Sequence, residues 1–131
     1  MAYEISNNAL KITAIAGADL SSKQYRFVKM SADNTVVVCA GATDAPIGVL
    51  QNNPISGAEA SVLVVGGTKL VASAAIAAGI KIGTDANGKA DAKVAGTDTT
   101  EYTVGVVIQS SGADADILTA VINCASPNRA A

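Results

Sequence analysis

The sequence predicts an all-β protein, either a small β-sandwich or a squat β-barrel, built from two pseudo-repeated halves with little helix. Short segments rich in Val and Ile alternate with Gly, Asn and Asp, as strands alternate with turns. Segments 46–51, 57–65 and 28–34 are echoed in the same order by 103–109, 112–121 and 80–88. Half of the residues are hydrophobic but only 3% are aromatic, so Val, Ile, Leu and Ala must form the core, which suits thin β layers.

A chain of 131 residues fits one domain. We expect residues 1–15 to form an N-terminal arm and the first strand. Residues 16–125 are expected to form a single β domain, with pseudo-repeats at about 17–66 and 74–123. Residues 126–131 contain Pro127 and no periodicity, which predicts a loose C-terminal tail.

In the first half, residues 10–15 alternate apolar side chains with Lys11 and Thr13, as a half-buried strand does. A second strand is expected at 25–30, with Tyr25 and Phe27 pointing to the core from one face. The turn dipeptide at 33–34 then predicts a hairpin bend before a β-branched strand at 35–39.

Pro46 is expected to begin the next strand, where its missing amide proton matters least. A loop at 51–57 leads to a strand that ends at Gly66-Gly67, a bend or bulge signal before another strand at 68–72. Segment 72–78 is the only helical candidate, but it is too short to be stable alone. The second half then repeats the pattern, with a hairpin turn at Asn87-Gly88.

The composition argues against an enzyme, since a chain without His lacks the commonest general base and metal ligand. We expect no catalytic residues, no metal and no cofactor. Asp114 and Asp116 would share one strand face, so they could hold a hard cation or act as catalytic carboxylates, but we favour a solvated strand end. Residues 85–88 resemble the start of a calcium loop without its closing Glu, which favours a hairpin turn.

Cys39 and Cys124 could pair, but without metal-type spacing we interpret them as buried thiols made in a reducing compartment. Charged residues are 15% of the chain and the net charge is −2, with no basic run. Nucleic-acid binding by phosphate neutralisation is therefore disfavoured. Because no apolar run approaches the roughly 18 residues of a membrane helix, no membrane partner is expected either.

A surface with so few charges predicts burial against another chain, and hence a homo-oligomer. The N-terminal arm is the candidate partner-binding segment, because its apolar residues could add a strand to a neighbour's sheet edge. Its residues are Ala2, Tyr3, Glu4 and Ile5. The competing interpretations are a disordered terminus and an edge strand of its own domain.

A family resemblance rests on segments 46–52, 57–60, 69–72, 88–90 and 105–107, together with Gly66, Ala75-Ile76, Gly79 and Asp85. In these segments the chain resembles the bacteriophage capsid decoration, or cement, proteins of the DUF2190 family. The match covers roughly residues 40–122 and is less clear before them. The resemblance implies a small β-rich structural protein that binds the outer surface of a phage capsid and stabilises the shell. It implies no catalytic residues.

The partners expected from this resemblance are the major capsid protein and further copies of the chain, with a trimer favoured because it suits local three-fold sites. The expected location is the capsid outer surface of the virion, after synthesis in the host bacterial cytoplasm. Two alternatives remain open. One is another phage surface, tail or fibre subunit; the other is a carbohydrate-binding adsorption module, which the scarcity of aromatic residues disfavours.

Overall fold

The computed structural model describes residues 9–131, in which the chain forms eleven β-strands and no helix. The predicted all-β class is confirmed. The strands are β1 (Leu10–Ala16), β2 (Phe27–Ala32), β3 (Thr35–Val38), β4 (Gly48–Leu50), β5 (Glu59–Val71), β6 (Lys81–Thr84), β7 (Ala90–Ala92), β8 (Tyr102–Thr103), β9 (Gly105–Gln109), β10 (Ile117–Asn123) and β11 (Asn128–Arg129). No helix long and apolar enough to cross a membrane is found in this part of the chain.

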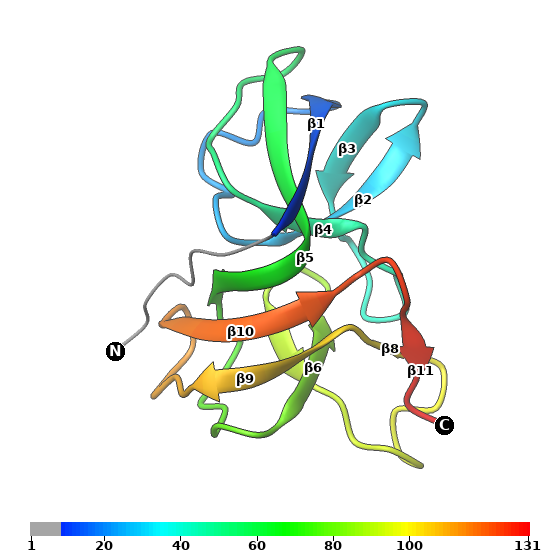
Figure 1. The fold of residues 1–131 in the computed structure, drawn as a ribbon, viewed down its shortest axis with the longest axis vertical. Helices are drawn as coiled ribbons and strands as arrows, with labels where there is room; N and C mark the ends of the chain where they lie inside the picture. The colour runs from blue at the N-terminus through cyan, green and yellow to red at the C-terminus, as the bar shows by residue number, and fades with distance from the viewer. Residues whose placement is uncertain (1–8) are drawn as a thin grey trace.

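The first half is a closed five-stranded barrel, the upper body in Figure 1. Its strands follow the order β1-β3-β2-β4-β5, and β5 pairs back onto β1. The β1–β3 pair is parallel and the others are antiparallel. Closure removes free strand edges. Small and branched side chains fill the interior: Ala14, Ala16, Leu20, Val28, Val36, Leu50, Ala60 and Val62.

Strand β5 is shared by both halves. Its first part pairs with β1 and its second part pairs with β10, and Val65 pairs with both. The strand bends between the two bodies (Figure 1). Gly66 has a φ of 138°, and a Cβ there would lie 2.9 Å from the Cβ of Ala9. The bend that Gly66-Gly67 predicts is thus present, but it lies within one continuous strand instead of separating two.

The second half repeats the connections of the first. Its strands follow the order β5-β10-β9-β6-β7, and a parallel bridge between Ala72 and Ala90 returns β7 to the end of β5. The second part of β5 therefore takes the place of β1, and β6, β7, β9 and β10 take the places of β2, β3, β4 and the first part of β5. The predicted pseudo-repeat is confirmed. The first repeat also includes β1, although the sequence analysis started that repeat at about residue 17, after this strand.

Backbone details match between the halves as well. Among residues 9–131, three non-Gly residues have a positive φ, and each has a counterpart with positive φ: Tyr25 with Gly79, Asn34 with Gly88, and Ala115 with Gly57. The hydrogen bond from Tyr25 N to Leu50 O measures 2.7 Å, and its counterpart from Gly79 N to Val107 O also measures 2.7 Å. The duplication thus reaches individual turns and hydrogen bonds.

Two expectations differ from the structure. Tyr25 lies in a turn with φ of 65°, so it does not share a strand face with the buried Phe27. The expected loose tail is paired over Asn128–Arg129, which form β11 against β8, and Ala130 N donates to Glu101 O at 2.9 Å. Backbone hydrogen bonds hold this segment, and they require no apolar periodicity that the sequence could show.

Candidate functional site

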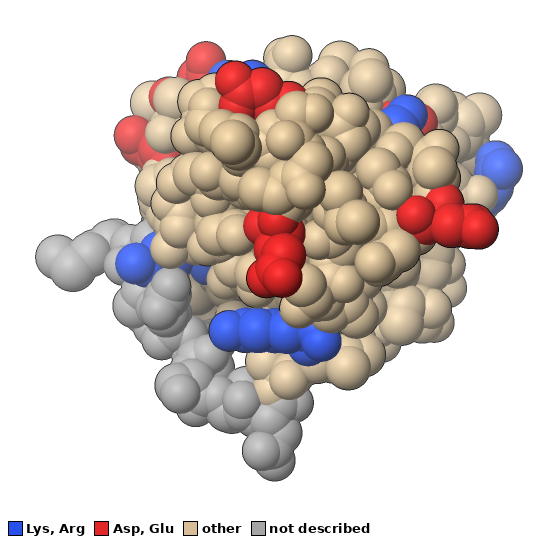
Figure 2. All heavy atoms as spheres, turned by 90° about the horizontal axis from the view of Figure 1, so that it is seen from above, with Lys and Arg blue, Asp and Glu red and all other residues tan. Residues whose placement is uncertain are grey.

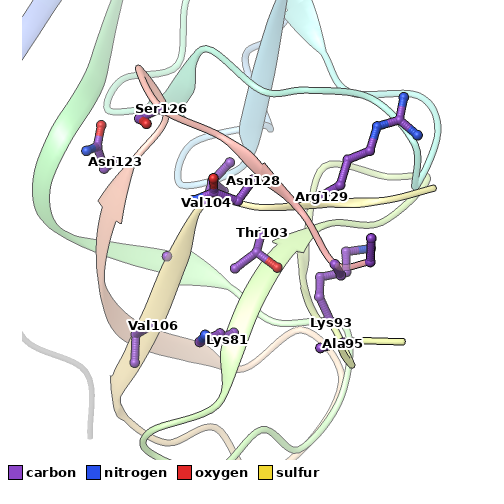
Figure 3. Close-up of a pocket in the computed structure, with 13 residues that line it drawn as sticks. Lys81, Lys93, Ala95, Thr103, Val104, Val106, Asn123, Ser126, Asn128 and Arg129 are labelled. Atoms are coloured by element: carbon purple, nitrogen blue, oxygen red, sulfur yellow. The ribbon is translucent and has the colours of Figure 1, made fainter. Parts of the chain in front are cut away.

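A hollow of about 450 Å³ lies on the outer face of the second half, between β9–β10 and the short β8–β11 ribbon (Figure 3). Most of the lining side chains are polar, and they come from segments far apart in the sequence. They include Lys81, Thr103, Asn123, Ser126, Asn128 and Arg129. The hollow is therefore a candidate binding site.

One wall of the hollow depends on a buried lysine. The side chain of Lys93 is 0% exposed, and its ammonium donates to Thr84 O at 2.8 Å, to Asp91 Oδ2 at 3.1 Å and to the carboxylate of Glu101. Each of the three ammonium protons therefore has an acceptor. These bonds tie the segment leading into β8 to the β6–β7 hairpin. Lys93 thus supports the hollow and is not available to a ligand.

The cations open to a partner at this hollow are Lys81 and Arg129. Lys81 is exposed on β6 and forms no ion pair with residues 9–131. The guanidinium of Arg129 lies 5.3 Å from the ring centroid of Tyr102, which fixes its stem on the β8–β11 ribbon. The arrangement can bind carboxylates and other hydrogen-bond acceptors of a partner.

The structure does not place Asp114 and Asp116 on one strand face, because β10 begins after them at Ile117. They lie in the turn around Ala115, which has a φ of 70°. Asp114 pairs with Lys89 at 2.9 Å, and this hydrogen bond and charge hold the pKa of Asp114 below its ordinary value. Asp116 Oδ2 accepts from Gly112 N at 3.0 Å. Asp116 is thus bonded within its own loop, whereas Asp114 pairs with a residue of the β6–β7 turn.

The hairpin prediction at 85–88 is confirmed. Asp85 Oδ1 accepts from the amides of Asn87 and Lys89, each at 2.8 Å, and Gly88 has a φ of 74°. Within residues 9–131 no group of three or more His, Cys, Asp or Glu side chains is arranged to hold a metal ion. The candidate partner-binding residues Ala2, Tyr3, Glu4 and Ile5 lie outside the described residues.

Cys39 and Cys124 are free and buried, as predicted. Burial raises the pKa of each thiol to about 12. Because the thiolate is the reactive form, neither cysteine should react with a thiol reagent such as DTNB at pH 8 while the protein is folded. Two thiols per chain should react after unfolding in denaturant. Rapid modification of either cysteine in the native protein would contradict the buried placement.

Sequence reasoning missed the hollow and its lysine. Residues 89–94 alternate polar and apolar side chains, a pattern typical of a partly exposed strand, yet Lys93 is buried because Glu101 reaches it from beyond the following loop. No local pattern signals that pairing. The β8–β11 ribbon was also missed, because strands of only two residues show no periodic pattern.

Comparison of the sequence with known protein families and with curated proteins finds no match. The fold does match a solved structure, the head fiber gp8.5 N base in bacteriophage phi29, with a TM-score of 0.66. The two chains share a fold. The alignment covers 89% of this chain and 96% of the phage chain at 18% sequence identity. At this identity the likeness concerns architecture, and it extends over nearly the whole of both chains.

Proposed function

We propose that this chain is a structural protein of a phage head, which binds the outer surface of the capsid and stabilises the shell. The observation that carries the proposal is the fold shared with the phi29 head fiber base over nearly the full length of both chains. The segments that resemble capsid decoration proteins support the same role. The partners are then the major capsid protein and other copies of the chain, with a trimer favoured, and the site of action is the virion surface.

The surface suits a protein that binds through many modest contacts. Seen from the end of the first barrel, it is mostly uncharged, with acidic and basic groups scattered between (Figure 2). Large apolar side chains are exposed on both halves: Leu10, Ile15, Met30, Ile55, Ile80, Val94, Val106, Ile117 and Val121. Contacts to several capsid subunits and to its own oligomer would add up to tight binding.

A second candidate follows from the same comparison, because the similar structure is the base of a fibre. The chain would then be the attachment module of a head fibre instead of a cement subunit. Cryo-electron microscopy of heads carrying this protein separates the two roles. A low cap on the shell indicates cement, whereas density rising radially from the attachment point indicates a fibre base.

The first test is binding of the purified full chain to phage heads from a strain with the gene deleted. The chain should sediment with the heads, saturate at a fixed number of copies and raise the temperature at which heads release DNA. If the purified chain does not sediment with these heads at any concentration tested, the proposal is overturned.

The same assay tests the N-terminal arm as the capsid-binding segment. A variant with residues 2–5 replaced by Gly and Ser should bind about tenfold more weakly if the arm adds a strand to a capsid sheet. A control variant with Gly and Ser at the exposed loop residues Thr99 and Thr100 should bind like the wild type. Equal binding of all three proteins would reject the arm proposal alone.

A further inference from the structure

The second part of β5, which follows the bend in Figure 1, pairs with β10 along one edge only. Val64 O accepts from Cys124 N at 3.0 Å, and Ala72 N donates to Asp116 O at 2.8 Å. The register between β5 and β10 is continuous between these two bonds. Because backbone groups alternate along an antiparallel strand, the even-numbered residues of this stretch face β10 and the odd-numbered residues face the opposite edge.

Both ends of that opposite edge are occupied. At one end, Val65 pairs with Leu10 of β1. At the other end, Val71 N donates to Tyr25 O at 2.9 Å. These two contacts confirm that the odd-numbered residues face away from β10, and they bound the stretch of edge that lies between them.

Gly67 and Lys69 lie in this stretch, and each directs its amide and carbonyl toward the edge. Within residues 9–131 no backbone group pairs with either residue there. The carbonyl of Lys69 accepts the hydroxyl of Thr68 at 3.0 Å, which leaves its second lone pair free. Backbone donors and acceptors in a row are satisfied by an added strand, so the partner that this edge selects is an extended chain segment.

The chain itself leads to this edge. Ala9 lies directly beside Gly66, since a Cβ on Gly66 would be 2.9 Å from the Cβ of Ala9. Because β1 runs antiparallel to β5 up to this point, residues preceding Ala9 need no turn to reach the open edge. Eight residues precede Ala9, more than a two-residue opening requires. Their covalent link also gives them a far higher effective concentration at the edge than a free partner has.

We propose that residues 6–8 continue β1 as a short strand on the open edge of β5, with Asn8 opposite Gly67 and Ser6 opposite Lys69. This is the register that follows from extending the β1–β5 ladder residue by residue. In an antiparallel ladder, each of these two pairs exchanges backbone hydrogen bonds in both directions. The added strand would give the amides of Gly67 and Lys69 the acceptors that residues 9–131 do not supply.

The pairing ends at Ser6, because the next amide on the edge, that of Val71, is already bonded to Tyr25 O. Residues 2–5, the candidate capsid-binding segment, would then leave the molecule from a fixed point beside Tyr25. An anchor at 6–8 goes beyond the proposed function, since it determines where that segment is presented. It is tested on purified protein without phage heads, so it can fail while capsid binding stands.

Amide hydrogen exchange gives the first test. Deleting residues 2–8 should make the amides of Gly67 and Lys69 exchange at least about tenfold faster than in the full-length chain, because their acceptors are removed. Thr13 is the matched control within the same two proteins. Its amide lies on the open edge of β1, two residues before Ile15, whose amide donates to Asn34 O at 2.8 Å. The exchange rate of Thr13 should not change.

Disulfide trapping tests the register. The full-length double variant Ser6→Cys/Lys69→Cys should form an intramolecular disulfide at least about tenfold faster than Asn7→Cys/Lys69→Cys, because a shift of one residue turns the side chain to the other face. The native cysteines are buried and should not interfere. Three results would overturn the proposal: equal rates for the two double variants, crosslinking between chains instead of within one, or unchanged exchange at Gly67 and Lys69 after the deletion.

Discussion

Replacing Lys93 with Met is expected to lower the free energy of unfolding by about 3 kcal/mol, near the lower end for breaking a buried ion pair. The change leaves the carbonyl of Thr84 without its donor and brings two carboxylates together without their cation. Asp91 and Glu101 keep 38% and 19% exposure, so water screens part of the repulsion. That access is why we place the effect near the lower end.

Equilibrium unfolding in urea measures the loss, with the slope against denaturant checking that the two-state description still holds. Lys81→Met is the matched control, since Lys81 is exposed on β6 in the same half, and it should change the stability by less than about 0.5 kcal/mol. A double-mutant cycle of Lys93→Met with Glu101→Gln should show a coupling of at least about 1 kcal/mol. Equal stability of the two lysine variants would show that the network contributes little.

Gly48→Ala and Gly105→Ala are each expected to destabilise the fold by about 3 kcal/mol, because the new methyl group meets backbone that cannot move aside. A Cβ at Gly48 would lie 2.4 Å from Leu63 O, and one at Gly105 would lie 2.6 Å from Val121 O. The two glycines occupy equivalent strands, β4 and β9, and each lies against a backbone carbonyl of the neighbouring strand. Equal losses of unfolding free energy at these equivalent positions would show that the two halves share energetic as well as geometric requirements.

Thermal unfolding should report each loss as a fall in Tm of roughly 10 °C for a chain of this size. Gly41→Ala is the control, because its nearest neighbouring atoms lie 4.0 Å away and its φ is not positive. That variant should unfold within a few degrees of the wild type. If Gly48→Ala and Gly105→Ala unfold like Gly41→Ala, the strand spacing at these positions must be looser than the structure gives.

These glycines explain why the sequence shows its duplication most clearly at Gly48-Val49 and Gly105-Val106. The glycine is required by the close approach of the neighbouring strand. The turns are repeated for an equally local reason. Asn34 and Gly88 both tolerate the positive φ that their hairpins need.

Local requirements of this kind made much of the fold predictable from the sequence. Alternation identified β1, and turn residues placed the hairpins. The buried thiols followed from composition. Each of these inferences needs only a segment and its immediate neighbours, because a strand's period and a turn's φ are properties of a few consecutive residues.

The tertiary structure alone decided what depends on which segments meet. It made β5 one strand shared by two bodies, buried Lys93 with Glu101, paired Asp114 with Lys89 and ordered 128–130 against β8. It also docked the β6–β7 turn of the second half on the first half, where Gly88 O accepts from Phe27 N. A local pattern records which way a side chain points, but a lysine is buried or free according to the segment that the fold brings against it, and that neighbour lies elsewhere in the chain.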